Sequence, residues 1–188
     1  MRRIAIFASG NGSNAENIIR YFNEGDHGAV VALVVCNRPG AGVIGRSERL
    51  GVPVRVMSAA EIRDADRMMK VMDEYEIDIV VLAGFLLMIP AFLTERYHDR
   101  MVNIHPSLLP KFGGKGMYGR HVHEAVVAAG ETETGITIHL VCDECDGGRI
   151  VFQARVGLTP DDTPESVERK IHELERVHFP RVIEETFC

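Results

Sequence analysis

Uninterrupted apolar runs, separated by segments of helical spacing, are the feature that most constrains this fold. The clearest runs are residues 29–36 (AVVALVVC) and 77–85 (IDIVVLAGF), and shorter ones lie at 3–9, 52–57 and 100–105. A strand that is apolar on both faces must be covered on both faces, which is typical of parallel sheets. Apolar residues at helical spacing fill the gaps, at residues 41–50 and 60–75 and around Ile18, Ile19 and Phe22.

The pattern changes after residue 130. Residues 134–141 (TGITIHLV) alternate in polarity, and residues 148–158 form a second strand-like run, which together predict an antiparallel hairpin. Residues 163–187 predict a closing helix, with Thr163 as its N-cap. We therefore predict one Rossmann-like α/β domain over residues 1–188, with a mostly parallel twisted sheet, helices on both faces and an antiparallel C-terminal hairpin.

Composition narrows the classes of partner. The formal net charge of −6 does not favour nucleic acid as a partner, and no apolar run is long enough to cross a membrane. We expect a cytoplasmic protein. Cys142 and Cys145 form a single C-x-x-C, which is a weak zinc or redox signal because a closed zinc site needs four ligands. We favour reduced cysteines and expect no metal.

A glycine-rich loop, ASGNGSN, follows the first predicted strand. Gly12 allows close approach of a ligand, and Ser13 with Glu16 has the spacing of a capping box, so a helix should begin near Ser13. Free N–H groups at a helix start bind anions, and the Ser13 and Asn14 side chains add donors. The loop predicts a phosphate site.

The same loop also fits a dinucleotide pattern. Gly10, Gly12 and Ala15 match G-x-G-x-x-A, but no acidic residue follows the second predicted strand. Arg38 lies there instead and suits a 2′-phosphate, so an NADP-dependent reductase stays open as an alternative.

Asn103 and His105 lie on one side of the strand at 100–105, at its carboxyl end. Ligands of open α/β sheets bind at such strand ends. Thr137 and His139 share the polar side of the alternating strand, and an acidic loop that contains Asp146 follows it. If these segments converge, an imidazole, an amide and a carboxylate meet at one point.

The imidazole, the carboxylate and the amide would have different roles in catalysis. A histidine moves protons near neutral pH, a nearby carboxylate favours the imidazolium, and an amide N–H donates to a developing oxyanion. No serine or cysteine is placed as a nucleophile, so the pattern favours direct acyl transfer to an amine. The alternative is that Asn103 and His105 only make local hydrogen bonds at a strand end.

At these residues the sequence resembles the folate-dependent formyltransferases. The resemblance is carried by NIHPSLLP at 103–110, by DECDGG at 143–148 and by ASGNGSN at 8–14, and it extends over nearly the full chain. The last motif narrows it to members that act on phosphoribosylglycinamide in purine biosynthesis. The resemblance implies that the glycinamide amine attacks the formyl carbon of 10-formyltetrahydrofolate, with no covalent enzyme intermediate.

The resemblance also implies roles for particular residues. Asn103 would hold the formyl oxygen, His105 would be the general acid/base, and Asp146 would raise the pKa of His105. Thr137 and His139 would support the site. The implied ribotide contacts are Gly12, Ser13, Asn14 and Glu175. The implied folate contacts are Arg63, Leu86, Leu87, Met88, Ile89, Asn103, Val141, Cys142 and Asp143.

Two departures from the family pattern concern loops. Leu87 stands where some relatives carry an arginine, which affects the contacts to the folate tail. Glycine-rich residues 113–116 follow Phe112 where many relatives have Pro-Gly, and this predicts a mobile loop over the site. We interpret His121 and His123, further on, as helix-start residues.

Several alternatives share these residues. A formyltetrahydrofolate hydrolase, or a formyltransferase for another amine, would need the same Asn, His and Asp. A reductase or a non-catalytic binding domain would leave the NIHPSLLP and DGG motifs unexplained. For the leading hypothesis we expect small-molecule substrates only, and a monomer or a weak homodimer.

Overall fold

Seven strands form one sheet in the computed structural model, which describes residues 1–188. They are β1 (Arg2–Ala8), β2 (Ala29–Cys36), β3 (Val54–Val56), β4 (Ile79–Leu82), β5 (Met101–His105), β6 (Glu133–Leu140) and β7 (Ile150–Gly157). The helices are α1 (Ser13–Asn23), α2 (Gly42–Arg49), α3 (Ala59–Arg63), α4 (Ala65–Glu74), α5 (Ala91–Arg96), α6 (Arg120–Ala128) and α7 (Pro164–Phe187).

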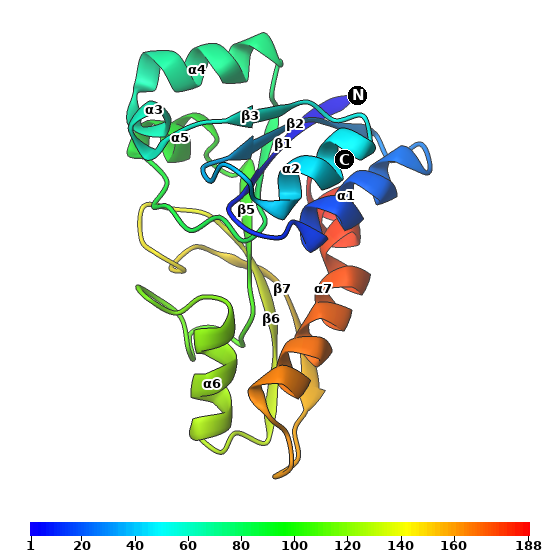
Figure 1. Cartoon of the computed structure of the whole chain (residues 1–188), viewed down its shortest axis with the longest axis vertical. Coiled ribbons are helices and arrows are strands. Elements are labelled where there is room, and N and C mark those ends of the chain that lie inside the picture. The colour runs from blue at the N-terminus through cyan, green and yellow to red at the C-terminus, as the bar shows by residue number, and fades with distance from the viewer.

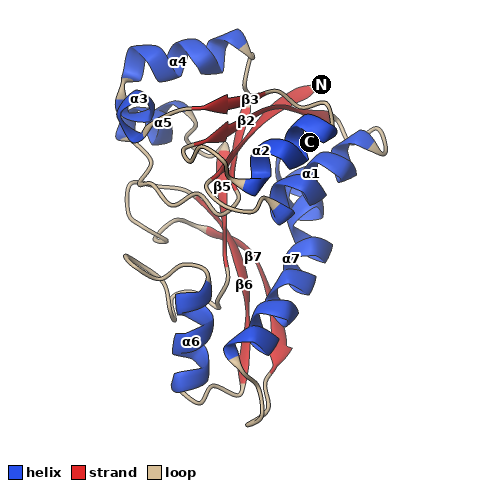
Figure 2. Ribbon diagram, in the orientation of Figure 1, coloured by secondary structure: helices blue, strands red, loops and turns tan.

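The strand order is β3-β2-β1-β4-β5-β6-β7. All pairs from β3 to β5 are parallel, whereas β6 runs antiparallel to β5 and β7 antiparallel to β6. Figure 2 shows β6 and β7 as a long hairpin that extends beyond the parallel part of the sheet. The predicted α/β class, the mostly parallel sheet and the C-terminal hairpin are confirmed.

The central strand β1 explains the uninterrupted apolar runs. Ile4 and Ile6 pack into a core shared with α1 and α7, whereas Ala5 and Phe7 pack into a second core shared with α3, α4 and α5. In Figure 1, α1 and α7 lie to the right of the sheet and α3, α4 and α5 lie at the upper left. Because neighbouring strand residues face opposite sides, both sets must be apolar.

The helical prediction over residues 60–75 was wrong in one respect, because two helices occupy it. Asp64 ends α3 in an extended conformation, and its carboxylate accepts a hydrogen bond from the Arg67 N–H as the N-cap of α4. A short polar side chain that bonds the backbone competes with helix continuation in this way. Met68 and Met72 are fully buried, as the methionine spacing predicted.

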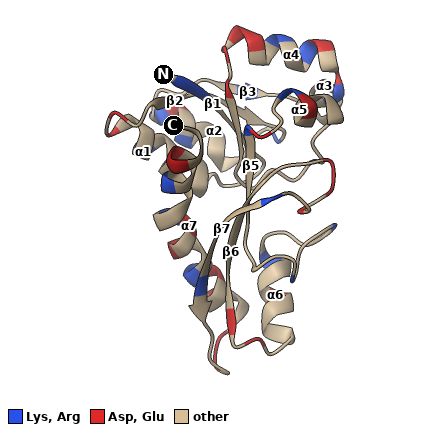
Figure 3. Cartoon of the chain, turned by 180° about the vertical axis from the view of Figure 1, so that it is seen from behind, with Lys and Arg blue, Asp and Glu red and all other residues tan.

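The C-terminal helix begins as predicted. The Thr163 side chain accepts a hydrogen bond from the Ser166 N–H, and Pro164 occupies the first helical position. None of the helices combines length and apolar character sufficient to cross a membrane. Figure 3 shows acidic and basic residues interspersed along α4 and α7, and a local ion pair joins Arg176 to Glu173 on α7.

The β6–β7 hairpin generates a stability prediction. A Cβ atom at Gly135 would lie 1.9 Å from the Ala154 carbonyl oxygen, so the backbones would have to separate. We expect Gly135→Ala to lower the free energy of unfolding by about 2 kcal/mol or more. Urea denaturation measures this.

Gly157→Ala is the matched control, because it changes the partner strand where a Cβ meets nothing within 4 Å. It should shift the free energy of unfolding by less than about 1 kcal/mol. Equal effects of the two variants would contradict the close approach at Gly135.

Candidate active site

Four polar side chains face one side of the sheet where β5 and β6 pair. The antiparallel register sets Asn103 opposite His139 and His105 opposite Thr137. Ile104 and Ile138 alternate with these residues and pack into the core, so the polar side chains must face the opposite side of the sheet. His105, Thr137 and His139 are buried, and Asn103 is half-buried. The pairing therefore brings together residues that are more than thirty positions apart.

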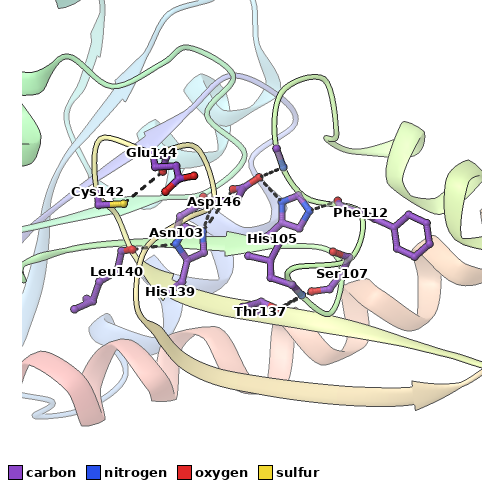
Figure 4. Close-up of polar contacts among 12 residues, drawn as sticks. Asn103, His105, Ser107, Phe112, Thr137, His139, Leu140, Cys142, Glu144 and Asp146 are labelled. Carbon is purple, nitrogen blue, oxygen red and sulfur yellow. Dashed lines mark hydrogen bonds and ion pairs between the residues drawn. The ribbon is translucent and has the colours of Figure 1, made fainter.

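The loop between β6 and β7, residues 141–149, returns Asp146 to this cluster (Figure 4). One Asp146 carboxylate oxygen lies 3.5 Å from His105 Nδ1, and the other lies 3.6 Å from His139 Nε2. The Gly114 N–H donates to the same carboxylate at 2.9 Å. Asp146 has a φ of 54°, a left-handed conformation that is uncommon outside glycine. The carboxylate is thus held from three sides.

The hydrogen-bond partners of His105 fix its tautomer. Its Nε2 lies 2.8 Å from the Phe112 carbonyl oxygen, which can only accept, so Nε2 carries the hydrogen. In the neutral ring the Nδ1 lone pair then faces Asp146. Protonation of Nδ1 converts this contact into an ion pair, so Asp146 is placed to stabilise the charged ring.

Burial and charge act in opposite directions on His105. Burial lowers the pKa of His105 below its ordinary value, and the negative charge of Asp146, which raises it, is the smaller effect. Asp146 therefore acts in the expected direction, although the pKa of His105 is lowered overall. Desolvation of a ring that is 4% exposed outweighs one carboxylate at 3.5 Å.

Asp146 itself remains an anion. Burial alone would raise the pKa of Asp146, but the neighbouring His139 ring, the hydrogen bond from the Gly114 N–H and the His105 ring lower it below its ordinary value. Hydrogen bonds to the charged form stabilise that form. A carboxylate is therefore available to balance an imidazolium at His105.

Asn103 is oriented by His139. The His139 Nδ1 lies 3.0 Å from the Leu140 carbonyl oxygen, so Nδ1 carries the hydrogen and Nε2 of the neutral ring accepts from Asn103 Nδ2 at 3.1 Å. One amide hydrogen of Asn103 is fixed by this bond. The second amide hydrogen is left for a ligand at the open end of the strand.

Thr137 supports the turn that follows His105. Its hydroxyl donates to the Ser107 carbonyl oxygen at 2.7 Å and accepts from the Leu109 N–H at 2.9 Å. Gln153 on β7 donates to the same hydroxyl at 2.8 Å. This fully buried network holds the NIHPSLLP turn against the hairpin.

The glycine-rich loop ends at Gly12, whose φ of 82° is left-handed, and a Cβ there would meet Val43 at 2.6 Å. Helix α1 begins at Ser13 as predicted, but the capping box was wrong. No side chain caps the helix, and Glu16 instead pairs with Arg20 and Arg46. The N–H groups of the first turn are therefore left without a side-chain acceptor.

Asn14 connects this loop to the C-terminal helix. Its amide donates to the Glu175 carboxylate at 2.9 Å, across 161 positions of sequence. Glu175 is buried, and burial raises its pKa. These two residues, predicted separately as ligand contacts, are in direct contact with each other.

The four residues of the expected apolar slot, on the segment after β4, differ in exposure. Leu86 and Met88 are exposed, whereas Leu87 and Ile89 pack against the core of α3, α4 and α5. The Leu86 N–H donates to the Ser9 hydroxyl, so it is not free for a ligand. Leu87 and Ile89 are half-buried, and the expectation that all four side chains line a slot for the folate stays a prediction. Arg63 is exposed at the end of α3 and forms no ion pair.

The predicted contacts on the 141–149 loop differ in accessibility. Val141 is tied to β5 by its N–H, which donates to the Met101 carbonyl at 2.9 Å, and Cys142 and Asp143 are exposed. The Asp143 carboxylate accepts a hydrogen bond from the Thr94 hydroxyl on α5. Thr94 is a residue that the sequence did not point to, because nothing in its local pattern marks a partner 49 positions away.

Two further contacts were missed because they belong to the backbone. The Phe112 carbonyl and the Gly114 N–H both touch the His105–Asp146 pair. Both His121 and His123 lie in the first turn of α6, as interpreted from the sequence. His121 is exposed beside Glu124, and His123 is buried with an unpaired Nδ1.

Known proteins share this fold and sequence. The profile described as formyl transferase matches residues 2–183. Phosphoribosylglycinamide formyltransferase of Bacillus subtilis is 35% identical, with 98% of this chain and 94% of that protein covered. The structure of glycinamide ribonucleotide transformylase 1 from Geobacillus kaustophilus gives a TM-score of 0.89 at 35% identity, with 100% of both chains covered.

Some relatives are longer proteins. The chloroplastic phosphoribosylglycinamide formyltransferase of Arabidopsis thaliana is 38% identical over 94% of this chain, which spans 63% of its length. The trifunctional purine biosynthetic protein adenosine-3 of Drosophila melanogaster is 36% identical over 97% of this chain, which spans 14% of its length.

The opposing effects on His105 generate a titration prediction. Because the charge of Asp146 raises the pKa of His105 while burial lowers it, Asp146→Asn should lower that pKa further. The imidazole resonances, followed by NMR across pH, measure it. Glu144→Gln neutralises a carboxylate of the same loop that does not contact His105, and it should leave the titration nearly unchanged. An unchanged or raised pKa in Asp146→Asn would contradict the assigned contact.

Proposed function

Because this chain belongs to the formyl transferase family, we propose that it transfers a formyl group to the glycinamide amine of phosphoribosylglycinamide in purine biosynthesis. The formyl donor in this proposal is 10-formyltetrahydrofolate. The observation that carries the mechanism is the convergence of Asn103, His105 and Asp146 at the end of β5. No nucleophilic side chain stands among them, which supports direct attack by the substrate amine.

The first step is attack of the amine on the formyl carbon. The formyl oxygen becomes negative, and the free N–H of Asn103 donates to it. His105 accepts the proton that the attacking amine loses, and Asp146 stabilises the resulting imidazolium. His105 then returns the proton to N10 of the folate as the bond from N10 to the formyl carbon breaks. The formyl group is now on the substrate amine, the proton is on N10 of the folate, and the enzyme has returned to its starting state.

The residue 113–119 loop has a part in this sequence. With Nδ1 facing Asp146, His105 exchanges protons with substrate through Nε2, and Nε2 accepts a proton only when the hydrogen of the neutral ring lies on Nδ1 and is donated to Asp146. The Phe112 carbonyl holds that hydrogen on Nε2 instead. That carbonyl must therefore withdraw when substrates bind. Gly114, Gly116 and Gly119 all have left-handed φ values, which suits a segment that changes conformation.

We assign the ribotide to the β1–α1 loop. The uncapped first turn at Gly12, Ser13 and Asn14 would bind the phosphate. Glu175, held by Asn14, would contact the sugar. The folate would lie against exposed Leu86 and Met88 and along the start of the 141–149 loop, where Val141, Cys142 and Asp143 lie. Arg63 is assigned to the folate tail by family resemblance.

One assay decides the reaction. The protein is mixed with 10-formyltetrahydrofolate, with and without phosphoribosylglycinamide, and the folate absorbance is followed. Turnover that requires the ribotide is the expected result. Turnover without the ribotide would identify a hydrolase instead, and turnover only with another amine would overturn the substrate assignment.

Two substitutions test the roles in proton transfer. We expect His105→Ala and Asp146→Asn each to lower kcat by at least about a hundredfold, because general acid–base catalysis contributes on that scale. Steady-state kinetics measure it, and circular dichroism checks that the fold is intact. Glu144→Gln, on the same loop as Asp146, should retain kcat within about threefold. A folded His105→Ala variant with near-normal kcat would remove His105 from the mechanism.

A further inference from the structure

Apart from the assigned contact of Cys142 with the folate, the C-x-x-C motif has no role in the proposed reaction. Cys142 and Cys145 are both reduced and exposed, whereas Cys36 is buried in the core. Both exposed thiols lie on the 141–149 loop, which also carries Asp143 and Asp146. The motif therefore lies within the loop that delivers the carboxylate to His105.

The chain turns at the C-x-x-C motif. The Cys142 thiol lies 3.5 Å from the Glu144 carbonyl oxygen, and that carbonyl is bonded to the backbone nitrogen of Cys145. The Gly147 N–H donates to the same carbonyl at 3.2 Å, so the chain turns at this point. Figure 4 shows the Cys142 sulfur directed toward Glu144. A short loop with two intervening residues is a spacing found in redox-active dithiols.

The two thiols differ in environment. Burial and the charge of the adjacent Asp146 raise the pKa of Cys145. The thiol of Cys142 is exposed, and its polar contact is with the Glu144 carbonyl oxygen. Because the thiolate is the reactive form, we assign the first attack to Cys142 and the second to Cys145.

We propose that Cys142 and Cys145 are a redox modification site, and that their oxidation to an intramolecular disulfide disables the catalytic pair. The oxidant is a small-molecule disulfide such as glutathione disulfide. The Cys142 thiolate attacks it, forming a mixed disulfide and releasing one glutathione. The Cys145 thiolate then attacks the Cys142 sulfur and releases the second. Two protein thiols lose two electrons and two protons, and one glutathione disulfide becomes two thiols.

The consequence for catalysis follows from the neighbours of Asp146, and it rests on the proposed function. Disulfide formation draws the Cys145 side chain away from Asp146 and toward Cys142. Asp143, between the cysteines, is held to Thr94 on α5, so the loop cannot shift as one body. The backbone around Asp146, already left-handed, must absorb the change. Its contacts with His105 and Gly114 are then lost.

The modification is tested by mass spectrometry in a Cys188→Ser background, which removes the other exposed thiol. The protein is equilibrated with mixtures of reduced and oxidised glutathione, alkylated and digested. A 142–145 disulfide is expected, and Cys145→Ser should instead retain a glutathione adduct on Cys142. Free thiols at both positions in every mixture would overturn the proposal. This measurement is independent of turnover, so it stands or fails separately from the proposed reaction.

The effect on the site is tested with the oxidised and reduced forms. Oxidation should change the NMR titration of His105 and lower formyl transfer by about tenfold or more, the scale of a lost acid–base partner, with recovery in dithiothreitol. In Cys145→Ser, which cannot form the disulfide, the same treatment should leave the His105 titration unchanged. A disulfide that leaves both the His105 titration and the activity unchanged would overturn the control of catalysis.

Discussion

The antiparallel pairing of β5 with β6 is the constraint on which the site depends. The carboxyl ends of parallel strands lie at one edge of a sheet. Because β6 runs in the opposite direction, residues from within β6 lie beside the carboxyl end of β5. This is how His139 comes to hold Asn103, and Thr137 comes to hold the turn after His105. The reversal also starts the 141–149 loop next to the same strand end, which lets Asp146 return to His105.

Electrostatics within the site are a balance between solvent exclusion and charge. Burial keeps His105 neutral more strongly than Asp146 favours its protonated form, while hydrogen bonds keep Asp146 ionised. A neutral imidazole beside a fixed anion is a base whose conjugate acid already has a counter-ion. The same arrangement would fail if the carboxylate were unpaired, because a lone buried charge is costly.

Much of this could be predicted from the sequence, because apolar periodicity reports burial directly. It predicted the parallel sheet, the hairpin and the location of Asn103 and His105 on the same side of one strand. It failed where a side chain had two possible partners, as with Glu16, whose carboxylate pairs with Arg20 and Arg46 instead of capping α1. It did not point to Thr94 or indicate the net direction in which the pKa of His105 is shifted, since long-range contacts and burial are properties of the folded molecule.

The contacts that the residue 112–114 segment makes with the catalytic pair come from peptide groups alone. The Phe112 carbonyl and the Gly114 N–H supply them, and any residue other than proline at 114 would keep that N–H. The identity of the side chain at Phe112 does not enter these contacts, whereas the φ of 90° at Gly114 favours glycine. A comparison of side-chain types alone would therefore not mark Phe112 as part of the site. Replacement of single amides by esters is the chemical change to which this part of the site would respond.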